Sequence, residues 1–131
     1  MKNKSSSTIH APISRGELMD KISILEIKKE RITGVKLKNI KKELDTLKSL
    51  VSSNNLEINL DLFSQLKEVN ISLWEIEDQI RTKESKEEFD NEFIELARSV
   101  YKQNDKRALI KKEINRKYNS DLIEEKSYEK Y

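Results

Sequence analysis

The sequence contains no cysteine, two glycines, one proline and a single histidine, His10. Without cysteine the chain cannot form disulfide bonds, thiolate metal sites or a cysteine nucleophile. With so little glycine and proline it has few residues suited to tight turns, so we do not expect a sheet of many strands. A mechanism that needs a histidine base would have to use His10, which lies in a segment that we expect to be flexible. These absences favour a helical protein and leave few routes to catalysis.

Long apolar runs are also missing. No stretch reaches the roughly 18 apolar residues that identify a membrane helix, and residues 1–8 lack the apolar centre of a signal peptide. We therefore expect a cytoplasmic protein that does not bind a membrane. Charged residues make up 38% of the chain and hydrophobic residues 35%. A chain this polar folds most economically as helices that each keep one charged face.

Apolar residues recur at helical spacing in four segments. The most regular series is Leu62, Leu66, Val69, Leu73, Ile76 and Ile80. A second series, spaced three and four residues apart like a short coiled-coil seam, is Leu37, Ile40, Leu44, Leu47 and Val51. We predict helices over about 15–32, 35–51, 60–84 and from 85 or 90 to about 118. The predicted fold is therefore all-α, an antiparallel bundle of about four helices.

Both ends of the chain lie outside this predicted bundle. We expect a flexible leader over 1–12 and a single helical-bundle domain over 13–131, in which 121–131 forms a tail with one turn of helix at most. Ser14 and Glu17 mark the start of the first helix, because they have the spacing of a capping box, in which each side chain accepts a hydrogen bond from the other's backbone N–H.

Charge is unevenly distributed along the chain. Residues 1–56 carry six more basic than acidic residues, 57–95 carry eight more acidic than basic residues, and 96–131 carry four more basic than acidic residues. An acidic middle between basic flanks suits a central helix over 60–84 that packs against both of the other regions. The net charge of +2 gives no general reason to expect a polyanionic partner.

Four spaced motifs resemble a known family. They are GELMDKISILEIK at 16–28, LWEIED at 73–78, FIELARSVYKQND at 93–105 and SDLIEEKSY at 120–128. The chain resembles a family of small bacterial all-helical proteins classed only as a domain of unknown function. The resemblance implies a compact cytosolic domain, sometimes encoded near or joined to glycosyltransferase-like genes, and hence a link to surface-glycan metabolism. It implies no activity.

Pairs of acids on two predicted helices form one chemical possibility. Glu26 and Glu30 are four residues apart and Glu75 and Asp78 are three apart, so each pair shares a helix face. Four carboxylates that face one another would hold Mg²⁺, which prefers oxygen ligands and can activate water. This is loosely similar to all-helical nucleotide pyrophosphohydrolases, which use an ExxE and an ExxD helix; the spacing of Glu26 and Glu30 is one residue too long. The alternative is that the acids lie on solvated faces.

A basic run over 106–117 forms a second possibility. It carries six basic residues and one acidic residue, Glu113. On one helix it would suit the phosphates of a nucleic acid or of another ligand. It lacks the interleaved aromatic residues of a single-strand binder, and no DNA-reading motif accompanies it. We therefore do not expect nucleic acid as the main partner, and we expect the run either to complement the acidic helix or to lie on a solvated face.

A third possibility is a polar network between helices. Asn104 falls on the apolar stripe of the last helix, where an asparagine either fixes register or belongs to a site. Charged residues of three helices could meet near it, with Trp74 and Tyr101 as the apolar wall of a pocket. The candidates for this polar network or ligand site are Asp20, Lys21, Glu26, Lys28, Glu77, Asp78, Arg81, Asn104, Asp105 and Arg107.

These observations leave three functions open. The first is a helical-bundle interaction or accessory protein that forms a homodimer or binds a protein partner, because the helices are amphipathic and no complete catalytic set is present. The second is a small Mg²⁺-dependent nucleotide hydrolase or phosphate-ligand-binding domain, with Glu26, Glu30, Glu75 and Asp78 as metal ligands. The third is nucleic-acid binding through 106–117. No cofactor is expected except Mg²⁺ in the second case, and whether the chain is an enzyme stays open.

Overall fold

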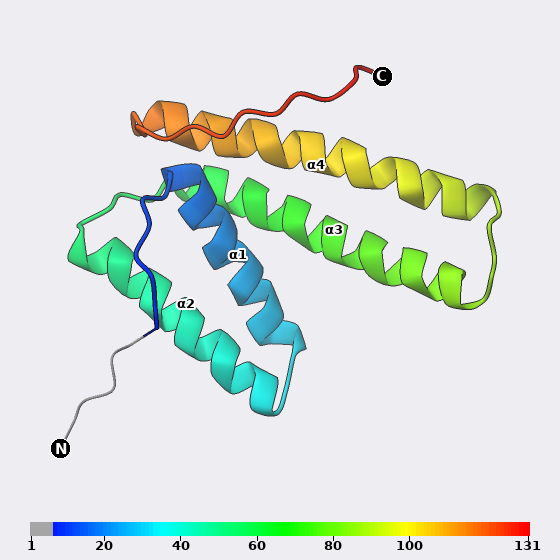
Figure 1. Ribbon diagram of the computed structural model, residues 1–131, viewed down its shortest axis with the longest axis horizontal. Helices are drawn as coiled ribbons and strands as arrows, with labels where there is room; N and C mark the ends of the chain where they lie inside the picture. Colours follow the sequence, from blue (N-terminus) through cyan, green and yellow to red (C-terminus); the bar gives the residue numbers. More distant parts are fainter. Residues whose placement is uncertain (1–6) are drawn as a thin grey trace.

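The computed structural model describes residues 7–131, and this part of the chain folds into four helices without a strand (Figure 1). The helices are α1 (Arg15–Arg31), α2 (Val35–Ser53), α3 (Leu60–Ser85) and α4 (Asn91–Lys117). The all-α prediction is confirmed, and the predicted bounds agree within two residues once α4 takes the later of its two expected starts. None of the four helices combines the length and the apolar character that crossing a membrane would need.

Side-chain caps determine where three of the helices begin. Ser14 Oγ accepts a hydrogen bond from the Glu17 backbone N–H at 3.1 Å, and Asn59 and Asp90 cap α3 and α4 in the same way. The reciprocal half of the predicted capping box does not form, because the Glu17 carboxylate instead accepts a hydrogen bond from Lys111 on α4. The first turn of α1 is thereby tied to the last third of α4.

The hub of the fold is α1. It packs against each of the other three helices, whereas α2 packs against α1 alone within the described chain, and α3 and α4 lie antiparallel along each other (Figure 1). The helix expected over 60–84 does pack against both flanking regions, since α3 meets α1 and α4, but α1 and not α3 contacts all the other helices of the described chain. The reason lies in the apolar pattern: the buried residues of α1 surround much of the helix, whereas those of α3 form one stripe.

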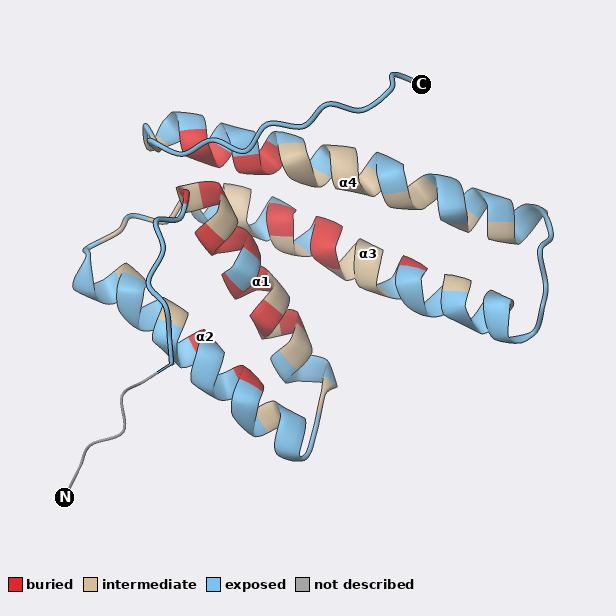
Figure 2. Ribbon diagram, viewed as in Figure 1, coloured by how far each residue is buried: buried red, intermediate tan, exposed pale blue. Residues whose placement is uncertain are grey.

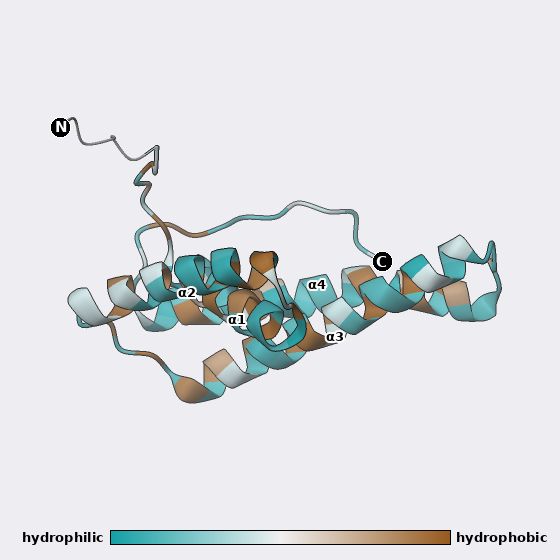
Figure 3. Cartoon of the chain, turned by 90° about the horizontal axis from the view of Figure 1, so that it is seen from below, coloured by the Kyte–Doolittle hydropathy of each residue, from teal (hydrophilic) through white to brown (hydrophobic). Residues whose placement is uncertain are grey.

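One hydrophobic core lies where the four helices come together (Figure 2). Its buried members are Leu18, Met19, Ile22, Leu25, Ile40, Leu44, Leu66, Val69, Ile110 and Ile114. In Figure 3 hydrophilic and hydrophobic residues alternate along each helix, as amphipathic helices require. The core therefore uses the first half of α3 and the last third of α4.

The outer halves of α3 and α4 project beyond this core (Figure 1). No residue between Ile76 and Ile110 is buried, although both of these residues are. We call residues 77–105 the arm. Apolar side chains of the arm are half-buried or exposed: Ile80, Phe89, Phe93, Ile94, Leu96, Val100 and Tyr101.

The two ends of the described chain have no regular structure. Residues 7–12 of the predicted leader are exposed and form neither helix nor strand, and the rest of the leader, 1–6, lies outside the described residues. Residues 121–131, which we call the tail, form no helical turn and run back along α4 (Figure 1). The direction of the tail brings its acidic residues to the basic end of α4.

Candidate functional site

A buried carboxylate, that of Asp20, lies between α1, α3 and α4. Its side chain is 1% exposed. Asn70 Nδ2 and Arg107 Nε each donate a hydrogen bond to Asp20 Oδ1 at 2.9 Å, and Arg107 Nη2 donates to Oδ2. Asn70 also donates to Ser23 Oγ at 2.8 Å, and Lys111 Nζ lies 3.9 Å from Asp20 Oδ2. We call these five residues the Asp20 network.

The Asp20 carboxylate fixes the position of Arg107. Two hydrogen bonds to one carboxylate hold the planar guanidinium in a single orientation. The hydrogen bond to Asp20 raises the pKa of Arg107, although burial works in the opposite direction. The Arg107 side chain is still 28% exposed, so its outer edge reaches the surface, where Nη1 lies 3.5 Å from Asn104 Oδ1.

Lys111 is the second cation of the Asp20 network, and its side chain is 8% exposed. It donates hydrogen bonds to Glu17 at 2.7 Å and to Glu124 of the tail at 3.2 Å. Burial is the strongest influence on Lys111 and lowers its pKa, but the hydrogen bonds that Lys111 donates to both acids and the charge of Asp20 outweigh it, so the pKa is raised. Conversely, the hydrogen bond from Lys111 lowers the pKa of Glu124. Three acids thus surround two bases at the junction of α1 and α4.

The polar network expected from the sequence is only partly the one that forms. Asp20, Arg107 and Asn104 do come together. Lys21 is exposed, and Glu26 lies on another side of α1 beside Lys67 and Lys48. Sequence reasoning missed Ser23, Asn70 and Asn115 as buried polar residues. The burial of Asn70 could have been predicted from the sequence, because Asn70 stands beside the apolar stripe of α3 at the spacing of a core position.

A shallow groove of about 410 Å³ lies beside the Asp20 network, between α1, α3 and α4. Its lining residues are Ile24, Ile27, Lys28, Asn70, Leu73, Trp74, Glu77, Asp78, Arg81 and Arg107. Six of them belong to the predicted site: Lys28, Trp74, Glu77, Asp78, Arg81 and Arg107. The structure therefore brings together at this groove residues that are far apart in the sequence.

The groove has an apolar base and a charged rim. Arg81 Nε pairs with Glu77 at 3.1 Å, whereas Lys28 forms no ion pair within residues 7–131. Such an amphipathic hollow, open to one side, suits a side chain of a partner protein better than an enclosed small molecule. Tyr101 and Asp105, the other predicted members, do not line the groove and contact Tyr131 of the tail instead.

The four predicted metal ligands do not converge. Lys67 Nζ lies between Glu26 and Glu30, at 3.1 and 3.0 Å, and Glu75 faces Arg31 at 3.6 Å. Within residues 7–131 no group of three or more acidic or histidine side chains is placed to hold a metal ion. Burial lowers the pKa of Lys67, but its hydrogen bonds with Glu30 and Glu26 outweigh burial and raise it. An ammonium group thus occupies the place between two carboxylates where a divalent cation was expected.

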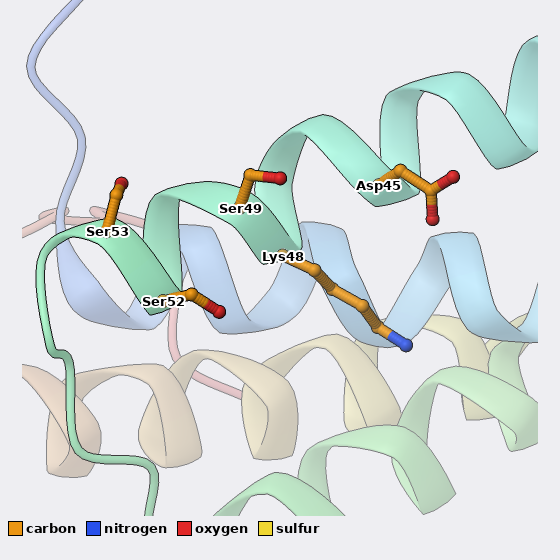
Figure 4. Close-up of a pocket in the computed structure, with 5 residues that line it drawn as sticks. All are labelled: Asp45, Lys48, Ser49, Ser52 and Ser53. Atoms are coloured by element: carbon orange, nitrogen blue, oxygen red, sulfur yellow. The ribbon is translucent and has the colours of Figure 1, made fainter.

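A second hollow lies on the surface of α2. It is lined by Asp45, Lys48, Ser49, Ser52 and Ser53 (Figure 4). These side chains point in different directions, and Lys48 reaches toward Glu26 on α1, 3.6 Å away. Because they do not converge on one point, they form no candidate site.

Most of the basic run over 106–117 is paired with acids of its own chain. Besides Arg107 and Lys111, Lys112 pairs with Glu125 at 3.4 Å and Arg116 with Glu113 at 3.1 Å. These partners come from α1, α4 and the tail, and not from the acidic part of α3 as expected. Pairing of this kind leaves fewer free cations for the phosphates of a nucleic acid.

Comparison with known proteins gives one match. A family of unknown function (DUF6165) matches residues 9–131, which include all four helices and the tail. No curated protein and no solved structure matches the chain. The resemblance found in the sequence motifs is thereby confirmed.

Proposed function

We propose that this chain, which belongs to the family of unknown function DUF6165, is a helical interaction protein that works as a homodimer. The observation that carries the proposal is the arm. It is a pair of helices with no buried residue, and it nevertheless carries apolar side chains along its length. Helical domains usually bury such residues against a second layer, and two helical hairpins together form a four-helix bundle. A second copy of the arm supplies that layer.

The spacing of residues along α3 favours an antiparallel arrangement. Trp74 lies in the groove, and Phe89 lies at the tip of the arm, 15 positions later. The midpoint between them is close to Arg81. Because α3 ends at Ser85, a helical rise of about 1.5 Å per residue places the end of α3 roughly 17 Å from Trp74, and Phe89 follows four residues later. A twofold axis near that midpoint lays the two arms side by side and brings the tip of each chain to the groove of the other.

The tip is acidic, and within the described chain the groove offers it one unpaired base, Lys28, beside one unpaired acid, Asp78. Residues 84–95, which form the tip, carry six acidic residues and one basic residue, Lys86. Glu84 and Glu87 form no ion pair within residues 7–131, and the same is true of Lys28 at the groove. Complementary unpaired charges of this kind favour one register over others and speed association. Phe89, which is 58% exposed, would supply the apolar anchor.

Light scattering coupled to size exclusion tests the proposal over a range of concentrations. We expect a dimer in the native chain, and a dissociation constant raised about 10- to 100-fold by Phe89→Ala, the usual range for an aromatic anchor. Leu109→Ala is the matched control, because Leu109 is 68% exposed on α4 but lies outside the arm and the groove. Lys28→Glu should also weaken the dimer, and Glu87→Lys in the same chain should restore part of the loss.

Two results would reject this arrangement. A chain that stays monomeric at the highest attainable concentration would reject self-association. A dimer that Phe89→Ala and Leu109→Ala weaken equally would place the interface away from the tip and the groove. Circular dichroism of each variant separates loss of the dimer from loss of the fold.

The other functions expected from the sequence have less support. The magnesium-dependent hydrolase lacks a converging set of ligands in residues 7–131, and the basic helix is largely paired. A role as an accessory protein in surface-glycan metabolism derives from the family resemblance alone and stays a prediction. Deleting the gene and comparing the surface glycans of the two strains would test it.

A further inference from the structure

The tail is attached to α4 by a short series of polar contacts. The Ser120 backbone N–H donates to the Asn115 carbonyl at 2.9 Å, where the tail leaves the helix. Glu124 and Glu125 then pair with Lys111 and Lys112. At the end of the chain the Tyr131 hydroxyl donates to Asp105, and its ring meets that of Tyr101 edge to face, with centroids 4.9 Å apart. The tail therefore follows α4 from its end back to the arm (Figure 1).

These contacts resemble those of a bound peptide more than those of a folded element. Every residue over 121–131 is exposed, including Leu122, Ile123 and Tyr128, and none is helical or extended in a strand. The segment consequently buries little apolar surface. The Lys112–Glu125 pair is exposed on both sides and therefore screened by solvent, and Lys111 keeps Glu17 and Asp20 when Glu124 leaves. Contacts that are few, polar and at most partly buried can be exchanged without unfolding the domain.

The surface under the tail, in contrast, is built by the core. Lys111 is buried, and Glu17 and Asp20 fix its position. Lys112 lies one residue further along α4, so two adjacent cations face the two adjacent acids of the tail. We call the surface formed by Tyr101, Asp105, Lys111 and Lys112 the α4 face.

We propose that the α4 face is a binding site for an acidic peptide segment of a partner protein, and that the tail occupies this site in the free chain. The chemistry of the occupant is that of the tail itself: two consecutive acidic side chains followed at a distance by a tyrosine. A tethered segment acts at an effective concentration on the order of 1 mM. A tail whose own dissociation constant, measured as a free peptide, is about 100 μM thus lowers the apparent affinity of a competing partner segment roughly tenfold.

Fluorescence anisotropy with a labelled synthetic peptide of residues 120–131 tests this proposal on the full chain. One protein is the native chain, and the other carries Glu124→Gln and Glu125→Gln, which weaken the attachment of its own tail. We expect the substituted chain to bind the peptide about ten times more tightly than the native chain does. Glu129→Gln is the matched control, because it removes a tail carboxylate that has no partner on α4, and it should leave the affinity unchanged.

Several outcomes would overturn the proposal. They are equal binding by the native and the doubly substituted chain, absence of binding by both, and equal binding of a peptide that itself carries the two glutamine substitutions. A tail exchanged between copies would appear as a dimer that Glu124→Gln with Glu125→Gln abolishes, and it would also overturn the intramolecular assignment. The tail reaches the arm only at Tyr101 and Asp105, whereas the anchor of the dimer proposed above is Phe89 at the tip, so a dimer that Phe89→Ala weakens and the tail substitutions leave unchanged would separate the two proposals.

Discussion

Replacing Asp20 by asparagine removes the charge at the centre of the Asp20 network and keeps the shape of the side chain. In the native chain the carboxylate accepts three hydrogen bonds, one from Asn70 and two from Arg107. Asparagine keeps a single carbonyl acceptor and brings an N–H₂ group toward two cations. Asp20→Asn therefore leaves Arg107 without its charged partner in a partly buried place.

The expected cost follows from the burial of the two partners. Removing one partner of a buried ion pair costs about 3–5 kcal/mol. We expect about 3 kcal/mol, because Arg107 is partly exposed and Lys111 keeps Glu17 and Glu124. With an unfolding entropy of roughly 2.1 cal/mol/K per residue, this lowers the melting temperature by about 11 °C. Such a loss is a large part of the roughly 5–15 kcal/mol of a typical domain.

Urea unfolding followed by circular dichroism measures this effect, with Glu30→Gln as the control. Glu30 also pairs with a lysine at 3.0 Å, but its side chain is 57% exposed, so we expect less than about 1 kcal/mol. Asp20→Asn combined with Arg107→Met should cost less than the sum of the two single changes, because they remove the same pair. A cost below about 1 kcal/mol for Asp20→Asn, or additive single costs, would refute the reasoning.

Three further predictions concern the junction of α1, α4 and the tail. Gly16→Ala should destabilise the fold by about 1–3 kcal/mol in urea unfolding despite the better helix propensity of alanine, because the added Cβ would lie 2.6 Å from the Lys111 carbonyl oxygen. Tyr118→Phe should raise stability by about 1 kcal/mol in the same assay, since the buried hydroxyl has no hydrogen-bond partner in the described chain. Because the hydrogen bond from Lys111 lowers the pKa of Glu124 below its usual 4.5, attachment of the tail should be complete at neutral pH and lost as the pH falls through that lowered value. Sharpening of the tail amide signals in NMR spectra as the pH falls below the usual value of 4.5, absent in Glu124→Gln, would show this release.

The elements of the fold could be predicted from the sequence because each depends on local patterns. Apolar spacing identified four helices, and the capping residues Ser14 and Asp90 mark where α1 and α4 begin. The packing order could not be predicted in the same way. The charge blocks correctly placed 60–84 against both flanking regions, but they did not indicate that the buried residues of α1 face three neighbouring helices. Burial on several sides of a helix is a property of the whole assembly.

The sequence correctly predicted those members of the candidate site whose position follows from the face of a single helix. Asp20 and Arg107 were expected in one network, and they pair. The four acids were expected to converge, but long lysine side chains reach across from other helices, and Lys67 fills the space between Glu26 and Glu30. The tail gave no periodic signal at all, since a segment held by a few ion pairs needs no repeating pattern. Its position depends on Lys111 and Lys112 in three dimensions.

The attachment of α2 to α1 alone has a consequence for how the molecule opens. Short links, one of them containing Gly34 with a φ of +77°, join α2 to its neighbours. Detachment of α2 would remove the contacts of Ile40 and Leu44 but would leave the interfaces of α1 with α3 and α4 in place. Proteins open in cooperative units of unequal stability, and a unit with one interface opens most readily. Amide hydrogens of α2 should therefore exchange with solvent before those of α1, in a partly unfolded form that keeps the remaining three helices together.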